Sequence, residues 1–385
     1  MASYSEFLPE ARTSGLSYKL NRITQDHVKV SCDEMERNKK TVCHIVDKVI
    51  EHMQKDATFQ FSFDRKLGVG SSHENLKVRE ADEFDYNICL KIPDGWRGQI
   101  EGPGRSGPQG YAKYKLVGVS SSTSLVHRKW QSFMDHSHYL LPFKLYDWFY
   151  GLVAKALASE LRHCPEIQGV TLRKIGPSAN LIIINKPGRR EMSVDLAPTL
   201  QMTGMPPGFR DMMRQIHDVM RQSGMWQIST KQYTGASSGG NGLWWRISTS
   251  PVEKYVLSSI DKYSGGDSRG GCRKQVLRLL KLLREVEGSN WLAIKSYHLK
   301  HLMMSESCRH GDWSAGKVDV RFIGCLRALQ KCLRERKLQN VFFPKMNMFA
   351  DLSAFTANDL AGRVKRIADT IERDSEKIVE YLPLT

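Results

Sequence analysis

The run EFDYNICL at residues 83–90 restricts the possible folds of this chain more than any other stretch. Apolar and polar residues alternate along it, with Phe84, Tyr86, Ile88 and Leu90 on one parity and Glu83, Asp85, Asn87 and Cys89 on the other. This two-residue period predicts a β-strand with one buried face. Residues two apart on a strand project to the same side, so the carboxylates of Glu83 and Asp85 point the same way. Two like charges repel there unless a positive group lies between them.

A tight corner, Gly70-Ser71-Ser72, precedes this strand, and eleven residues separate Ser71 from Glu83. Glycine lets backbone N–H groups approach a phosphate, and serine hydroxyls add hydrogen-bond donors. Carboxylate oxygens suit Mg²⁺, whose coordination is often completed by substrate phosphates. The two features together predict a metal and phosphate site, which Asp195 in the segment SVDLAP would complete as a third acid. The alternative is the polar outer face of an edge strand beside an ordinary turn.

Composition limits the class of protein. The 385 residues, 41% of them hydrophobic, predict a globular chain large enough for two lobes. No apolar run reaches the ~20 residues of a membrane span, and the start MASYSEFLPEAR lacks the basic and apolar segments of a secretory signal. Eight cysteines without a CxxC pair are typical of reduced thiols. We therefore expect a cytoplasmic protein without a membrane partner.

The positive charge is concentrated in one part of the chain. Residues 271–340 contain fifteen Lys or Arg against six Asp or Glu, a net +9 of the +16 that the whole chain carries. A concentrated basic surface is typical of proteins that bind a polyanion. The alternative is a solvated surface without a specific partner.

Hydrophobic periodicity gives the organisation of the chain. It predicts an amphipathic helix at 35–53, a mobile irregular loop at 93–110, and a hairpin of strands 181–185 and 191–200. Beyond about residue 205 the pattern is mostly helical, with helices at 272–287, 290–304, 318–337 and 354–381 and Gly/Ser-rich loops at 234–242 and 263–271. The predicted fold class is α+β, with a sheet-containing lobe at 1–205 and a helical lobe at 206–385.

The ordered motifs carry a resemblance. The pattern G-S, eleven residues, E-F-D and a later strand Asp is similar to the active site of the nucleotidyltransferase superfamily. More narrowly, GSSHENLKVREADEFDYNICLKIP resembles the active-site segment of cyclic GMP-AMP synthase, cGAS, and the cGAS-like receptors. Further landmarks follow in the order of that family: WWRISTSPVEK, CRKQVLRLLKLL, KSYHLKHL and LRERKLQNVFFPKMNMF. The resemblance covers the chain from about residue 35 and implies a bilobal nucleotidyltransferase fold, with a mixed sheet and a long spine helix in the N-terminal lobe.

The resemblance also implies roles for single residues. Glu83, Asp85 and Asp195 match the catalytic acids, which would hold two Mg²⁺ or Mn²⁺ ions. The matched nucleotide contacts are the phosphate corner, two base contacts, a stacking tyrosine and two lysines near the phosphates: Gly70, Ser71, Ser72, Arg246, Glu253, Tyr297, Lys281 and Lys300. Ala197 stands where the vertebrate enzyme has a hydroxyl residue, which leaves the choice of nucleobase open. Outside this context, Arg246 could pair with a carboxylate and Tyr297 could be a core aromatic.

One element of the vertebrate enzyme is missing. Its zinc-binding insertion, a His and clustered cysteines between the WR strand and the CRK helix, helps to grip DNA. The matching stretch VLSSIDKYSGGDSRGGC has no histidine and one cysteine, Cys272, whereas a structural zinc needs four ligands, so we expect no structural zinc. A distant alternative metal set is His298, His301, Cys308 and His310.

The missing element is typical of the invertebrate cGAS-like receptors, several of which sense double-stranded RNA. A-form RNA is recognised mainly by shape and backbone, so a duplex reader needs Lys and Arg on phosphates. The predicted RNA contacts lie on the helix at 35–53 and at the start of the helix at 272–287: Lys39, Lys40, Lys48, Arg273 and Lys274.

The resemblance implies a cytoplasmic, metal-dependent enzyme of innate antiviral signalling. Double-stranded RNA would activate it to make a cyclic dinucleotide of the cyclic GMP-AMP type from ATP and GTP. A STING-type receptor would read the product, and the resemblance allows a dimer or larger oligomer on nucleic acid. Two alternatives stay open: a non-catalytic interaction protein like the Mab relatives, and an RNA-tailing or oligoadenylate-type polymerase of the same superfamily.

Overall fold

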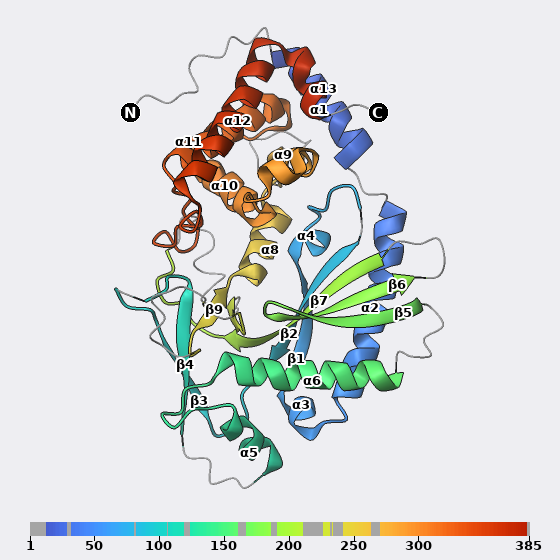
Figure 1. Cartoon of the computed structure of the whole chain (residues 1–385), viewed down its shortest axis with the longest axis vertical. Helices are drawn as coiled ribbons and strands as arrows, with labels where there is room; N and C mark the ends of the chain where they lie inside the picture. Colours follow the sequence, from blue (N-terminus) through green and yellow to red (C-terminus); the bar gives the residue numbers. More distant parts are fainter. Residues whose placement is uncertain are drawn as a thin grey trace. The chain divides into compact units, whose positions relative to one another are not determined.

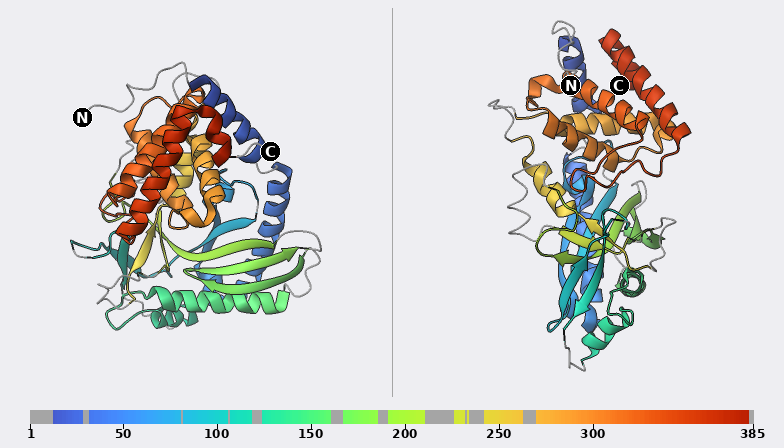
Figure 2. Two further views of the ribbon diagram at one scale, coloured as in Figure 1. Left: turned by 45° about the horizontal axis from the view of Figure 1, so that its top comes forward. Right: turned by 90° about the vertical axis from the view of Figure 1, so that its left-hand side faces the viewer.

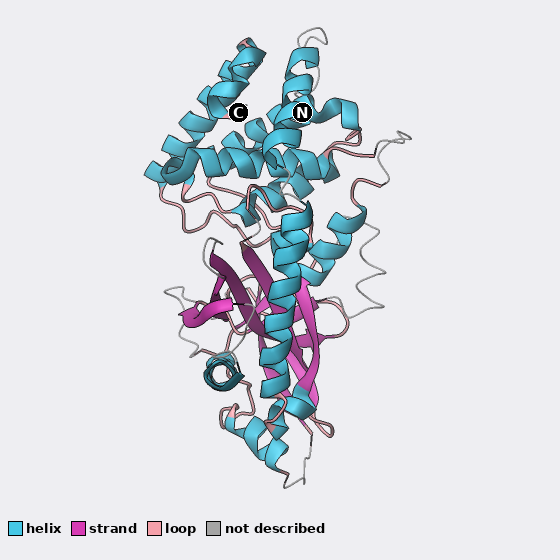
Figure 3. Ribbon diagram, turned by 90° about the vertical axis from the view of Figure 1, so that its right-hand side faces the viewer, coloured by secondary structure: helices cyan, strands magenta, loops and turns pink. Residues whose placement is uncertain are grey.

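The chain divides into two compact units. The computed structural model describes residues 13–28, 32–80, 82–105, 107–118, 124–160, 167–185, 191–210, 226–231, 233, 242–262 and 270–382. The sheet unit comprises Cys32–Asn75 and Ala81–Tyr255, and the helical unit comprises Met1–Ser31, Leu76–Glu80 and Val256–Thr385. Every strand of the described residues belongs to the sheet unit, and the helical unit is built from helices and loops (Figure 3).

The strands form one mixed sheet (Figure 1). They are β1 Phe63–Val69, β2 Glu83–Leu90, β3 Arg97–Glu101, β4 Tyr111–Val117, β5 Ile167–Ile175, β6 Ser178–Asn185, β7 Glu191–Met202, β8 Trp226–Ser229 and β9 Trp245–Ser248. The order along the main path is β1-β2-β7-β8-β9-β4-β3, while β6 joins β5 to β7. Strands β2 and β7 run parallel, and the other pairs of the described chain run antiparallel. The α+β prediction with a mixed sheet is confirmed.

Strand β2 lies inside the sheet, between β1 and β7. The predicted alternation holds at its start, where Glu83 is exposed and Asp85 is half-buried. It fails further along, because Asn87 and Cys89 are buried as well. A central strand is covered on both faces there, and the amide of Asn87 is satisfied by donating to Oε1 of Gln227 at 2.6 Å. The prediction of a single buried face was therefore wrong for the second half of the strand.

Two further predictions for the sheet had different outcomes. The hairpin is confirmed, since β6 and β7 pair antiparallel, while the turn between them lies outside the described residues. The irregular loop at 93–110 is wrong in part, because it contains β3, which pairs with β4. A Cβ on Gly98 would come within 1.8 Å of the hydroxyl of Tyr114, so the glycine allows this ring to pack over the strand.

Helices cover the sheet. In the sheet unit they are α2 Cys32–Met53, α3 Ala57–Ser62, α4 Gly70–His73, α5 Leu125–Ser132 and α6 Pro142–Glu160. The amphipathic helix predicted at 35–53 is confirmed as α2, whose residues Val42, Ile45, Val46 and Val49 are fully buried. Helix α6, which was not predicted, contacts α2, β5 and β7 (Figure 1). The border between the units falls within α8, Ser250–Ser259.

Within its described residues, the helical unit contains five longer α-helices and one of a single turn, besides the end of α8. They are α1 Thr13–Ile23, α9 Arg273–Glu287, α10 Ser296–Arg309, α11 Val318–Arg334 and α12 Ala354–Arg373, and they are followed by the single turn α13 Ile378–Tyr381. A π-helical turn, Thr24–Val28, follows α1, and 3₁₀ turns occupy Gly288–Trp291, Ala315–Lys317 and Ser375–Lys377. Helices α11 and α12 pack side by side (Figure 2).

The predicted helices of this unit are largely confirmed at 272–287 and 318–337, and wrong in detail at the other two places. The helix expected at 290–304 begins only at Ser296, after the 3₁₀ turn. The helix expected at 354–381 is interrupted at Asp374, whose extended backbone ends α12 and whose carboxylate accepts from the N–H of Glu376. An Asp side chain that caps a new turn competes with continued α-helix.

Two further observations concern the chain as a whole. No helix among the described residues is both long and apolar enough to cross a membrane. The lobe boundary after residue 205 stays a prediction, because compact packing units and functional lobes need not share their borders.

Candidate active site

The three predicted acids come from two neighbouring strands. In the parallel pair of β2 and β7, Asp85 lies opposite Asp195 and Glu83 lies opposite Ser193. Glu83, Asp85 and Asp195 therefore share one face of the sheet, since paired positions and positions two apart project to the same side. Glu83 is exposed, and the two Asp residues are half-buried. The structure thus brings together the acids that the sequence singled out.

Asn180 on β6 extends this row and was missed by the sequence analysis. It pairs with Asp195 across the antiparallel β6–β7 ladder. Its amide nitrogen donates to Oδ1 of Asp195 at 2.8 Å and to Oγ of Ser193 at 2.8 Å. Asn180 is 2% exposed, and its Oδ1 has no hydrogen-bond partner in the described chain. A polar residue inside the apolar run ANLIII was the signal that could have identified it.

The charges on this face oppose one another. Burial raises the pKa of Asp195, the hydrogen bond from Asn180 lowers it, and the negative charge of Glu83 raises it again. The net result is a pKa above the usual range of an aspartate. Burial of the carboxylate therefore outweighs the one hydrogen bond that supports the ionised form, and the charge of Glu83 adds to the effect of burial.

The Gly-Ser corner lies against these acids. Gly70 has φ +74°, a backbone conformation that favours glycine, and a Cβ there would come within 2.0 Å of Oδ2 of Asp85. The hydroxyl of Ser72, which is 6% exposed, donates to the backbone oxygen of Glu83. Ser72 thus ties the corner to β2, while Ser71 is half-buried and remains the better candidate for contact with a phosphate.

The sequence analysis also missed two basic residues next to the corner, Lys254 and His73. Nζ of Lys254 donates to the backbone oxygen of Gly68 at 2.8 Å, just before the corner. His73 follows the corner directly, with its ring edge-to-face on Tyr86 at 4.9 Å between centroids. Burial, and then the positive charges of Lys39, Lys254 and Lys66, lower the pKa of His73 to about 4. The histidine is therefore neutral at physiological pH, and the corner is fixed on both sides.

The donor set fits a hard divalent cation. Three carboxylates share one face, and burial and then the charge of Glu83 raise the pKa of Asp195, so a cation between them would stabilise the ionised carboxylates. Within the described residues, no three His, Cys, Asp or Glu side chains are gathered closely enough to form a finished metal site. The strands thus fix the backbone positions of Glu83, Asp85 and Asp195, and their carboxylates are not yet clustered as ligands.

Comparison with known proteins gives the family. The model of the Mab-21 protein nucleotidyltransferase domain matches residues 72–259, and that of the Mab-21 protein HhH/H2TH-like domain matches residues 272–366. The chain belongs to the Mab-21 family. The nucleotidyltransferase match of this Mab-21 protein contains all three acids, and Gly70 lies just before it.

Relatives of this Mab-21 protein are similar along most of its length. "Cyclic GMP-AMP synthase-like receptor 3" of Stylophora pistillata is 28% identical over 95% of this chain and 98% of that protein. A "Cyclic GMP-AMP synthase-like receptor" of Microplitis demolitor is 23% identical over 96% of this chain and 68% of the relative. "Cyclic GMP-AMP synthase" of Mus musculus is 25% identical over 86% of this chain and 65% of the mouse protein. The predicted resemblance is confirmed.

Two predicted base contacts of this Mab-21 protein lie in the sheet unit. Arg246 on β9 faces Tyr111 on β4, with its guanidinium 5.5 Å from the centre of that ring. Glu253, in the first turn of α8, is 2% exposed and accepts a hydrogen bond from the hydroxyl of Thr249 at 2.8 Å. The structure therefore gives both side chains internal partners, and their contact with a base stays a prediction.

The remaining predicted nucleotide contacts lie in the helical unit. Lys281 on α9 is 6% exposed, and its Nζ donates to the backbone oxygen of Leu76 at 2.5 Å. On α10, the Tyr297 ring lies 6.0 Å from Nζ of Lys300 and edge-to-face on His301 at 4.4 Å. Lys281 thus anchors the chain segment that follows the phosphate corner in sequence.

The predicted RNA contacts differ in their environment. Lys39 and Lys40 on α2 are exposed and Lys48 is half-buried. Arg273 has a side chain that is 12% exposed, donates from Nη1 to the oxygen of Ile260 at 3.1 Å and lies 5.4 Å from the Trp313 ring centre. Lys274 is half-buried beside it, and its backbone N–H donates to a carboxylate oxygen of Asp261 at 3.0 Å. These contacts give Arg273 a structural role, and all five RNA contacts stay predictions.

The distant alternative metal set is not assembled in the described residues. Nδ1 of His298 accepts from the backbone N–H of Lys295, and Nδ1 of His301 accepts from that of Val341, both at 3.2 Å. His310 lies 3.3 Å from Glu306, and Cys308 is exposed and forms no disulfide. These histidines are used in capping and packing, so this alternative was wrong.

Proposed function

We propose that this Mab-21 protein is a metal-dependent nucleotidyltransferase that joins ATP and GTP into a cyclic dinucleotide of the cyclic GMP-AMP type. Double-stranded RNA would activate it in the cytoplasm, and a STING-type receptor would read its product in antiviral defence. The observation that carries the proposal is the register of β2 and β7, which pairs Asp85 with Asp195 beside the Gly70 corner. The names of the relatives support the choice of product.

The residues of the site have separate tasks in this proposal. Two Mg²⁺ or Mn²⁺ ions, when bound, would activate a ribose hydroxyl and neutralise charge on the phosphates. Glu83, Asp85 and Asp195 would hold these ions through carboxylate oxygens. Asn180 orients the Asp195 carboxylate through its 2.8 Å hydrogen bond. Gly70 leaves the space that Asp85 occupies and lets the backbone approach a phosphate.

Activation by RNA rests on charge. The helical unit contains residues 271–340, where most of the net positive charge is concentrated, and α2 of the sheet unit carries the exposed Lys39 and Lys40. Contacts with phosphates do not depend on base sequence and release counterions, so affinity should fall steeply as salt rises. Long duplexes should activate better than short ones, because several copies can share one RNA.

The test is a synthesis assay on the full chain with Mg²⁺ or Mn²⁺ and each pair of nucleoside triphosphates. Each reaction is run with duplex RNA, with duplex DNA and without nucleic acid. Pyrophosphate release reports the reaction, and mass spectrometry identifies the product. We expect a cyclic dinucleotide from ATP with GTP in the presence of RNA, and none from Asp195→Asn. Equal activation by DNA would contradict the RNA assignment, and long linear products would favour a polymerase.

One observation favours a second candidate, a non-catalytic interaction protein of the Mab type. The described residues contain no finished cluster of metal ligands, and a scaffold has no need of one. Pyrophosphate release separates the candidates, since a scaffold would release none with any metal, nucleotide or nucleic acid. Metal binding that is weakened by Asp195→Asn would argue against the scaffold even if the activator were still unknown.

A further inference from the structure

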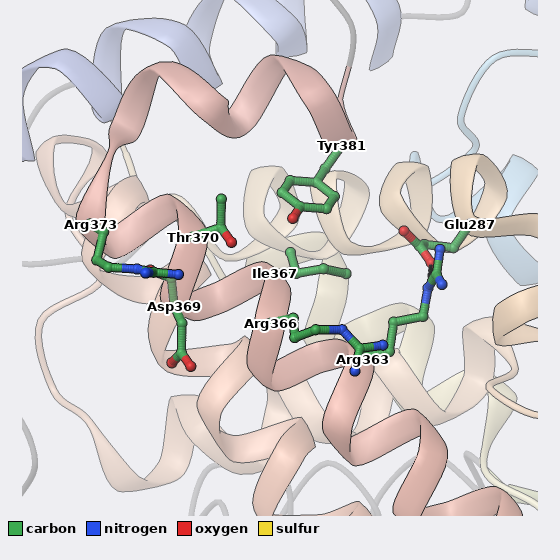
Figure 4. Close-up of a pocket in the computed structure, with 8 residues that line it drawn as sticks. All are labelled: Glu287, Arg363, Arg366, Ile367, Asp369, Thr370, Arg373 and Tyr381. Atoms are coloured by element: carbon green, nitrogen blue, oxygen red, sulfur yellow. Dashed lines mark hydrogen bonds and ion pairs between the residues drawn. The ribbon is translucent and has the colours of Figure 1, made fainter.

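The helical unit contains a pocket of about 350 Å³ along one side of α12 (Figure 4). Residues of α12 spaced three or four apart form its long wall, and the end of α9 and α13 contribute one residue each. The lining residues are Glu287, Arg363, Arg366, Ile367, Asp369, Thr370, Arg373 and Tyr381. None of them belongs to the proposed active site, so this pocket is distinct from it.

The carboxylates of this pocket are already neutralised by neighbouring cations. Glu287 forms an ion pair with Arg363, which Figure 4 shows reaching toward it. Asp369 lies 2.6 Å from a guanidinium nitrogen of Arg327 and also pairs with Lys365, and both of these cations come from outside the pocket lining. Burial would raise the pKa of Asp369, but the hydrogen bonds from Lys365 and Arg327 lower it. Asp369 is therefore ionised at neutral pH, and both carboxylates have cationic partners.

Two arginines are left with donors to spare. In the part of the chain that the structure describes, Arg366 makes no hydrogen bond or ion pair. Arg373 donates from Nε to the backbone oxygen of Asp369 at 3.2 Å, which leaves its terminal nitrogens available. Figure 4 shows Arg366 extending along the pocket toward Arg363. Guanidinium groups on one wall repel one another unless an anion lies between them, so the pocket has an excess of positive charge.

The remaining lining suits the rest of a small molecule. Ile367 is 1% exposed and forms an apolar floor. Figure 4 shows the Tyr381 ring above it, with the hydroxyl directed toward the floor. The hydroxyls of Thr370 and Tyr381 make no hydrogen bond in the described chain and can donate to a ligand. Charged side chains make up most of the lining, Ile367 and the Tyr381 ring supply its apolar part, and the volume falls in the range of small-molecule sites.

We propose that this pocket binds a small phosphorylated ligand of nucleotide size. Guanidinium groups match phosphate oxygens in a planar, two-pronged geometry, which favours phosphate over other anions. The Tyr381 ring and Ile367 would cover an apolar or aromatic part of the ligand. A duplex RNA is disfavoured as the occupant, because carboxylates bound the pocket on both sides, whereas the phosphates of a duplex need an extended basic surface.

The test is isothermal titration of the full chain with inorganic pyrophosphate, AMP and adenosine, in EDTA so that metal-dependent binding at the acids is suppressed. We expect binding of pyrophosphate and AMP, and none of adenosine. Arg366→Ala should weaken binding about tenfold or more, because hydrogen bonds to a charged group are lost. Arg366→Lys keeps the charge and should lose less. Asp195→Asn should bind as the wild type does, which separates this site from the proposed active site.

The matched control is Arg334→Ala, an exposed arginine of α11 outside the pocket, and it should leave binding unchanged. Circular dichroism and thermal melting of each variant check that the fold is intact. The proposal is overturned if Arg366→Ala binds AMP as tightly as the wild type, if Arg334→Ala loses affinity equally, or if adenosine binds as well as AMP. A loss of duplex RNA binding in Arg366→Ala, with AMP binding retained, would overturn it in favour of a polymer contact.

Discussion

The acidic face of the sheet unit and the arginine pocket of the helical unit both collect charge of one sign, but they balance it differently. On the sheet, burial and the charge of Glu83 keep the pKa of Asp195 above its usual range despite the hydrogen bond from Asn180. In the pocket, burial of Asp369 is overcome by hydrogen bonds from Lys365 and Arg327, and its pKa lies below the usual range. The excess is negative in the first region and positive in the second.

The difference indicates what each region can bind. Like charges held together reduce the stability of the folded chain, so an excess that persists on one surface favours a ligand of opposite charge. The sheet achieves this with acids from two neighbouring strands, Glu83 and Asp85 on β2 and Asp195 on β7. The pocket achieves it with one helix, whose arginines recur at helical spacing. A cation fits the first region and an anion fits the second.

The largest effect should come from removing one charge of the acidic face. We expect Asp195→Asn to lower synthesis on the order of a thousandfold or more, because a ligand of the catalytic metal is lost. The same change should raise the free energy of unfolding by about 0.5–1 kcal/mol, because a charge is no longer buried and its repulsion with Glu83 is relieved. A synthesis assay and urea unfolding measure the two effects.

The matched control is Asp64→Asn on the neighbouring strand β1. Asp64 is exposed, and its carboxylate lies 3.6 Å from Arg65. Its replacement should therefore change the free energy of unfolding by less than about 0.5 kcal/mol and leave the rate of synthesis unchanged. If Asp195→Asn were destabilising and Asp64→Asn were not, the acidic face would be a compensated surface, and the contrast with the pocket would fail.

The second prediction concerns the space beside Asp85. Gly70→Ala introduces a Cβ within 2.0 Å of the Asp85 carboxylate at φ +74°. Gly176→Ala is the matched control, since its φ is +56° and no atom lies within 4 Å of the new Cβ. We expect Gly176→Ala to cost about 1 kcal/mol of stability, with synthesis intact. Gly70→Ala should cost more and should reduce synthesis on the order of a hundredfold. Equal effects of the two variants would mean that only backbone strain matters.

Much of the acidic face could be predicted from the sequence, because its parts have local signatures. The alternation in β2, the Gly-Ser corner and the strand around Asp195 each follow from short-range patterns, and the order of the motifs connected them. Asn180 could not be predicted in the same way, because its role depends on the antiparallel register of β6 with β7. Burial of Asn87 and Cys89 depends likewise on neighbouring strands, which one strand's sequence does not reveal.

The arginine pocket could not be predicted, for a related reason. Arg363, Arg366 and Arg373 on an amphipathic helix have the pattern of an ordinary solvated face. Their surroundings depend on Glu287, on Tyr381 and on the break at Asp374, which the sequence analysis had placed inside one continuous helix. Charge on a helix therefore indicates a possible partner, and the tertiary contacts decide whether a pocket forms.

The third prediction uses one buried histidine from each unit. Burial is the largest cause that lowers the pKa of His73 and of His298 to about 4. Because the unfolded value is about 6.5, the unfolded chain binds more protons between pH 6.5 and 4, so stability is lost as pH falls through this window. Lowering the pH from 7 to 5 should cost on the order of 1 kcal/mol for each histidine, after allowance for partial exposure.

Urea unfolding at several pH values measures this loss. His73→Phe should reduce the pH dependence of the stability of the sheet unit, and His298→Phe should do the same for the helical unit. Spectroscopic probes placed in each unit can therefore assign the loss of stability to one histidine or the other. His44→Gln, at an exposed position of α2, is the control and should leave the dependence unchanged. A dependence that survives both replacements would show that other groups control the acid limit.

The smallest effect should come from a single exposed lysine on the sheet unit. The Lys40 side chain is 76% exposed and forms an i,i+4 pair with Glu36 at 2.9 Å, so Lys40→Gln should change stability by less than about 0.5 kcal/mol. If Lys40 contacts a phosphate of duplex RNA, the slope of log affinity against log salt should fall by about 0.9. Binding measured at four or five salt concentrations resolves this slope, whereas one concentration would not. Lys55→Gln, an exposed lysine just beyond α2, should leave the slope as it is. An unchanged slope in both variants would remove α2 from the RNA surface and leave the positive charge of the helical unit to bind the duplex.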